Sequence, residues 1–180
     1  MKVQILYTSL TGCTEKVARA IYSGLSGVEK SIHDLKEGVP ALDGDILLLG
    51  YWGMLGGPSE EMQAFLKTVE GKAVGVFCTL GYYADTAHAR QTLETGLSLV
   101  KEKNEVIGGF VCNGAVSRKL IEGQGKGRGL PPTEQKELRW EITADHPTQA
   151  ECALAAERFR ERIHLYTRCR DLGIPFQSIL

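Results

Sequence analysis

Residues 3–14 read VQILYTSLTGCT, an apolar run followed by a short run of hydroxyl-bearing residues around one glycine. The first five residues have the near-continuous apolar character of a strand that is covered on both faces of a parallel sheet. Apolar residues then recur at the spacing of one helical face, at Val17, Ala20, Ile21 and Leu25. This order of strand, turn and helix is the first unit of an alternating α/β fold.

The same order recurs along the chain. Apolar runs at 46–50, 73–78 and 106–111 predict three more buried strands, and a weaker run at 29–35 predicts an edge strand. Helical stripes lie between them, and the last helix is expected to begin near Thr148, where Glu151 completes a capping box. We therefore predict a single α/β domain over residues 1–180, with helices on both faces of a parallel sheet.

Residues 114–132 interrupt this alternation. They include the run GQGKGRG at 123–129, which is too rich in glycine for a strand or a helix. An irregular loop is expected here, either a solvated surface loop or one that contacts a partner.

Composition narrows the class of protein. The 21 basic and 22 acidic residues leave a formal charge of -1, which does not favour a nucleic-acid partner. The apolar runs are far shorter than the ~20 residues of a membrane-spanning helix, and no signal-peptide core is present, so no membrane partner and a cytoplasmic location are expected. The five cysteines contain no CxxC pair, which predicts reduced thiols and no metal site.

The turn after the first strand is the strongest candidate for a binding site. Ligands of an open α/β sheet lie beyond the carboxyl ends of its strands. Free N–H groups at the start of the following helix, with hydroxyl groups beside them, favour a phosphate. No Lys or Arg stands within the turn, so hydrogen bonds and the helix dipole would have to hold that phosphate. The turn consists of Thr8, Ser9, Leu10, Thr11, Gly12, Cys13 and Thr14.

The run Ser9-Leu10-Thr11-Gly12-Cys13-Thr14 resembles the Ser/Thr-x-Thr-Gly-x-Thr loop with which flavodoxins hold the terminal phosphate of FMN. The resemblance implies a five-stranded sheet of order 2-1-3-4-5 and FMN as the cofactor. It also implies that the loops after the third and fourth strands cover the flavin. The candidate cofactor-binding residues there are Tyr51, Trp52, Gly53, Met54, Thr79, Leu80, Gly81, Tyr82, Tyr83 and Asp85.

The residue types in these two loops suit a flavin ring. Trp52 and either Tyr82 or Tyr83 offer flat apolar faces for stacking. Glycines beside them let main-chain N–H and C=O groups approach the ring edge. The resemblance places the peptide between Gly53 and Met54 next to the flavin and implies that this peptide turns over when the flavin is reduced.

Several functions are compatible with this pattern. The resemblance implies an electron carrier that exchanges electrons with redox partner proteins and has no catalytic residue of its own. Residues 80–85, together with His146-Pro147-Thr148, are similar to a flavodoxin-like subgroup that accompanies anaerobic reductases, including bilirubin reductase. The alternatives are an FMN-dependent NAD(P)H or quinone reductase and a cofactor-free interaction domain. Cys13 and Arg19 match the Cys-x5-Arg spacing of low-molecular-weight tyrosine phosphatases, but the residues between them favour a helix.

Overall fold

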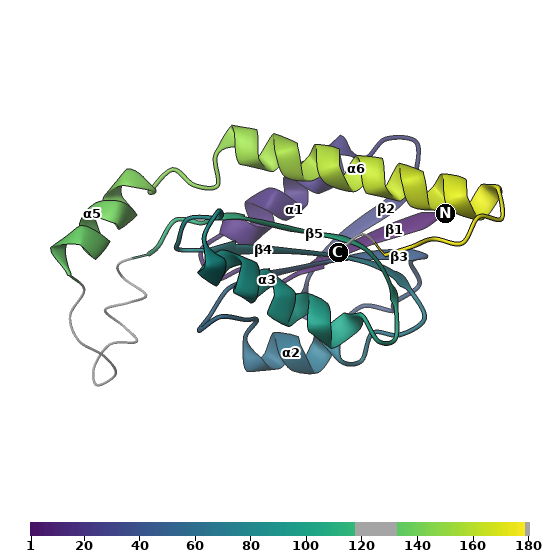
Figure 1. Cartoon of the computed structure of the whole chain (residues 1–180), viewed down its shortest axis with the longest axis horizontal. Coiled ribbons are helices and arrows are strands. Elements are labelled where there is room, and N and C mark those ends of the chain that lie inside the picture. Colours follow the sequence, from purple (N-terminus) through teal and green to yellow (C-terminus); the bar gives the residue numbers. More distant parts are fainter. Residues whose placement is uncertain (118–132, 179–180) are drawn as a thin grey trace.

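The computed structural model describes residues 1–117 and 133–178, and Figure 1 shows their arrangement. Most of the loop predicted at 114–132 lies outside the described residues. The elements are β1 (Lys2–Tyr7), α1 (Cys13–Gly24), β2 (Glu29–Asp34), the 3-10 turn η1 (Leu35–Glu37), β3 (Ile46–Trp52), α2 (Glu60–Leu66), β4 (Ala73–Leu80), α3 (Ala87–Val100), β5 (Glu105–Asn113), α5 (Glu134–Ile142) and α6 (Gln149–Asp171).

The sheet has five parallel strands in the order β2-β1-β3-β4-β5, which confirms the predicted fold and strand order. Every residue of β4 is buried, as expected for a strand with helices on both faces. The weak run at 29–35 forms the edge strand β2, whose residues are half-buried or exposed. All five carboxyl ends point toward one edge of the sheet, which we call the carboxyl edge.

Two helical layers enclose the sheet (Figure 1). Helices α1 and α6 cover one face, where Val17 and Phe159 belong to one apolar cluster. Helices α2 and α3 cover the other face, with Met62 and Leu97 in a second cluster. The capping box predicted at the start of α6 is present, since Thr148 and Glu151 bond reciprocally to each other's main-chain N–H groups.

Helix α5 was not predicted. Figure 1 shows it at the end of the molecule toward which the strands run. Trp140 is its one buried residue, and Leu138 and Ile142 are exposed. A single buried position gives no helical stripe, so the periodicity that located the other helices is missing here. None of the helices in the described residues is long and apolar enough to cross a membrane.

Candidate cofactor site

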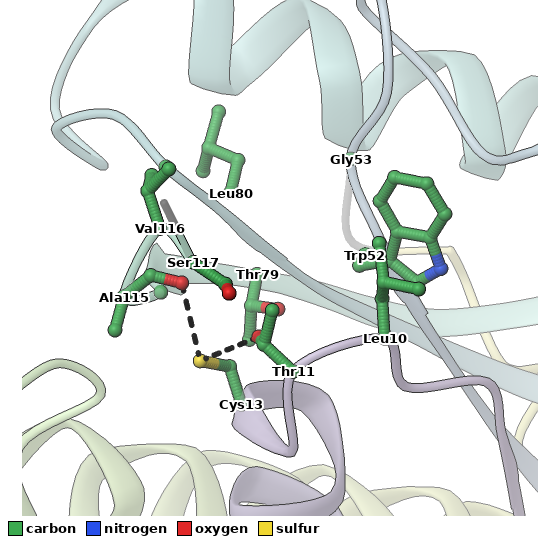
Figure 2. Close-up of a pocket in the computed structure, with 12 residues that line it drawn as sticks. Leu10, Thr11, Cys13, Trp52, Gly53, Thr79, Leu80, Ala115, Val116 and Ser117 are labelled. Atoms are coloured by element: carbon green, nitrogen blue, oxygen red, sulfur yellow. Dashed lines mark hydrogen bonds between the residues drawn. The ribbon is translucent and has the colours of Figure 1, made fainter. Parts of the chain in front are cut away.

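A cavity of about 240 Å³ lies at the carboxyl edge of the sheet (Figure 2). Four segments line it: the turn after β1, the ends of β3 and β4, and residues 114–117 after β5. The structure thus brings together the three loops that the sequence indicated and adds a fourth. The volume is below the ~300–1,000 Å³ typical of ligand pockets, so a ligand of the size of FMN would extend past it onto the surrounding surface. The lining residues are Leu10, Thr11, Cys13, Trp52, Gly53, Thr79, Leu80, Gly81, Gly114, Ala115, Val116 and Ser117.

The turn after β1 presents hydrogen-bond donors that the protein does not use. Ser9 is 5% exposed, and the buried hydroxyl oxygens of Thr8 and Ser9 have no partner among the described residues. A buried hydroxyl group without a partner lowers stability, and an anion at the turn would supply the missing acceptor. These hydroxyl groups therefore fit the phosphate of FMN.

Helix α1 also begins without a side-chain cap. Gly12 stands at its N-cap position with φ 86° and has no side chain to accept from the first N–H groups. The other α-helices in the described part of the chain are each capped by a side-chain oxygen, from Ser59, Thr86, Thr133 or Thr148. The first N–H groups of α1 thus keep their capacity for a ligand, and the positive end of the helix dipole favours an anion.

Thr11 and Thr14 have different positions in this turn. Thr11 lines the cavity, and its hydroxyl donates to Cys13 Sγ at 3.2 Å (Figure 2). Thr14 is fully buried and does not line the cavity; its Oγ1 lies 3.0 Å from Oγ1 of Thr79. This hydroxyl pair joins the turn after β1 to the end of β4, so Thr14 holds two walls of the cavity together.

Strand β3 places Trp52 and Tyr51 on opposite sides. Figure 2 shows the Trp52 indole beside Leu10 at one side of the cavity. Tyr51 is fully buried between the sheet and α3, where its hydroxyl donates to the main-chain oxygen of Thr92 at 2.7 Å, and burial raises the pKa of this phenol. The Tyr51 side chain therefore faces away from the cavity, because β3 continues to Trp52 and successive residues of a strand face opposite sides. Contact of Tyr51 with a cofactor stays a prediction.

Met54 belongs to a tight turn beside the cavity rather than to its lining. Met54 and Gly57 donate main-chain hydrogen bonds to each other's oxygens at 2.7 and 3.1 Å. Leu55 and Gly56 form the tip with φ values of 51° and 87°, as in a two-residue hairpin turn. Leu55 is 99% exposed there.

The loop after β4 contributes fewer residues than predicted. Thr79, Leu80 and Gly81 line the cavity, whereas Tyr82, Tyr83 and Asp85 lie outside the lining. Tyr82 makes edge-on contacts with Tyr83 and His88, and the Arg139 guanidinium of α5 lies 4.2 Å from the centre of its ring. Stacking of either tyrosine on a flavin stays a prediction.

Residues 114–117 form a wall that the sequence did not indicate. Gly81 permits this wall to come close, since a Cβ there would lie 2.2 Å from Cγ2 of Val116. The main chain of Ala115 is fixed by the hydrogen bond that its N–H donates to the oxygen of His146 at 2.9 Å. The loop composition at 114–132 gave no signal of this role.

The cavity can be mapped by thiol labelling. Cys13 lines it, with Sγ 3.7 Å from the main-chain oxygens of Ala115 and His146. Burial raises the pKa of the Cys78 thiol to about 12 and also raises that of Cys112, so both should resist alkylation. We expect slow maleimide labelling of Cys13 in the apoprotein and its loss when FMN is added, measured by peptide mass spectrometry.

Cys169 is the internal control for that experiment, because it is partly exposed and distant in sequence from every lining residue. Its labelling should not change with FMN. Equal labelling of Cys13 with and without FMN would place the cofactor elsewhere.

A doubly wound parallel sheet with a cavity at its carboxyl edge defines a class of ligand-binding α/β proteins. The sequence matches the Flavodoxin domain family over residues 4–160, and the chain belongs to this family. A curated relative, the flavodoxin-like domain-containing protein BilS of Clostridioides difficile (strain CD3), is 32% identical over 124 residues, which cover 67% of this chain and 70% of the relative. These matches confirm the predicted family.

Two solved structures share the fold. The flavodoxin of Fusobacterium nucleatum bound to flavin mononucleotide is 18% identical, covers 93% of this chain and 97% of its own, and superimposes with a TM-score of 0.53. Oxidised flavodoxin 2 of Bacillus cereus is also 18% identical, with coverage of 90% and 99% and a TM-score of 0.54.

Proposed function

We propose that the chain binds FMN and carries electrons between redox partner proteins. The observation that carries this proposal is the set of unused donors in the turn after β1, at the edge of a cavity that four loops line. The FMN bound to the Fusobacterium flavodoxin supports the same cofactor here. When bound, FMN supplies a ring that accepts and releases electrons, and the protein binds and orients it.

Separate groups of residues would hold the two ends of the cofactor. The hydroxyl groups of Thr8 and Ser9 and the first N–H groups of α1 would bind the phosphate. Trp52 would provide an apolar face for the ring, and the main chain of residues 79–81 and 114–117 would form the remaining walls.

The chemistry of the lining favours a carrier over a reductase. Among the described residues that line the cavity, none is His, Asp, Glu, Lys or Arg. The protein group that protonates an organic substrate in a reductase is most often one of these side chains, above all His. A carrier needs only a solvent-exposed path for electrons between its flavin and a partner protein. The similarity of residues 80–85 and 146–148 to the subgroup that accompanies anaerobic reductases makes such a reductase the first partner to test.

The purified protein tests this proposal directly. We expect a flavin absorption spectrum, and mass spectrometry of the released cofactor should identify FMN rather than FAD. With NADPH and a small organic acceptor, the isolated protein should show no rapid multiple turnover. Failure to bind FMN after titration would contradict the cofactor assignment, and rapid NADPH oxidation would replace the carrier with the FMN-dependent reductase.

A further inference from the structure

Lys36 supplies a cation to the turn after β1 from a different part of the chain. It lies in η1, directly after β2, and β2 pairs with β1 so that Asp34 stands opposite Tyr7. This pairing brings η1 beside the turn. The Lys36 ammonium group donates a hydrogen bond to the main-chain oxygen of Ser9, which stands 27 residues earlier.

This ammonium group retains capacity for a second partner. A lysine ammonium has three donors, and the oxygen of Ser9 is one acceptor. Of the ion pairs among the described residues, none involves Lys36. Lys36 is exposed, so the group reaches the turn without being buried.

Carboxylates lie near the start of the turn. Glu15, Asp34 and Glu37 all act on Tyr7, the last residue of β1; burial is the main reason that the pKa of Tyr7 is raised, and these carboxylates raise it further. Arg19 opposes them but is held by Glu15 at 2.7 Å. A phosphate at the turn would meet this negative field, and turn residues 8–14 contain no charged side chain to offset it.

We infer that Lys36 is a specificity-determining residue that offsets the charge of the FMN phosphate and so makes the site select phosphorylated flavin over riboflavin. This inference rests on the proposed function. The Ser9 side chain supports the inference independently. Its buried hydroxyl has no partner among the described residues, and the main-chain oxygen of the same residue accepts the hydrogen bond from Lys36. The turn would thus combine neutral donors with one charged donor.

The test compares FMN and riboflavin on the full-length apoprotein. Dissociation constants come from quenching of flavin fluorescence, at low and at high salt, for the native protein, Lys36→Gln and Lys67→Gln. Lys67 is the matched control: it is exposed, and it follows α2, which runs from the carboxyl end of β3 back toward the start of β4. Both variants therefore lose one positive charge, but only one loses it at the turn.

We expect Lys36→Gln to weaken FMN binding by about tenfold, the effect of one charge-assisted hydrogen bond, with riboflavin binding unchanged. The salt dependence of FMN binding should fall in the same variant, and Lys67→Gln should change neither flavin. Unchanged FMN binding in Lys36→Gln, or an equal loss for both flavins, would overturn the inference and leave FMN binding intact. A native protein that binds riboflavin as tightly as FMN would overturn the phosphate site itself.

Discussion

Gly12→Val is expected to weaken FMN binding by about tenfold or more, because the left-handed conformation at the start of α1 opposes a β-branched residue by roughly 1–2 kcal/mol. Gly12 has φ 86°, and a Cβ at this position would meet nothing within 4 Å. The strain therefore acts on the main chain alone. The turn relieves it by moving, and the N–H groups of α1 then lose their common direction with the hydroxyl groups of Thr8 and Ser9. Titration of the apoprotein with FMN measures the effect.

Gly27→Val is the control for that variant. Gly27 has φ 71° and equally open surroundings, but it lies between α1 and β2, at the opposite edge of the sheet. Both variants should unfold at similarly lower temperatures, whereas only Gly12→Val should bind FMN more weakly. Equal FMN affinities for the two variants would refute a role for the turn in phosphate binding.

Gly53→Ala is expected to lower the free energy of unfolding of the apoprotein by about 1–3 kcal/mol, the usual effect of overpacking. The added Cβ would lie 2.7 Å from Cγ2 of Thr92 and 3.3 Å from Cβ of Leu80. The main chain cannot easily withdraw, since the N–H of Gly53 donates to the oxygen of Thr79 at 2.7 Å. Urea denaturation gives the free energy.

A second substitution separates this contact from other effects of the alanine. Thr92→Ser removes the methyl group in question and keeps the hydroxyl that donates to the oxygen of His88. The double variant should therefore recover part of the lost stability, which appears as a coupling energy in a double-mutant cycle. Additive effects of the two substitutions would show that the methyl group is not the obstacle.

Gly53 has a packing role that the sequence did not indicate. The sequence suggested that glycine allows the main chain to approach a flavin and to turn over. In the structure Gly53 has no left-handed φ, and its lack of a side chain is required by the packing of Thr92 and Leu80. Packing across loops depends on tertiary structure, so no local pattern could have revealed it.

The fold was predictable because four of the five strands are short apolar runs and each core helix carries an apolar stripe. The first wall of the cavity was predictable because the hydroxyl-rich turn directly follows a strand. The wall at 114–117 was not predictable, since it is composed of small residues without a motif. The role of Lys36 was not predictable from the sequence of the turn, because this lysine lies in η1, after the neighbouring strand β2.

The hydroxyl pair of Thr14 and Thr79 couples two distant positions of the sequence. They stand 65 residues apart. Thr14 lies in α1, which follows β1, and Thr79 lies in β4, which β3 separates from β1 in the sheet. Loss of either hydroxyl would leave the other buried without its partner, whereas replacement of both by valine would keep the shape and remove the unsatisfied group. Substitutions at the two positions should therefore be inherited together, and an alignment of close relatives should show threonine at both positions or at neither.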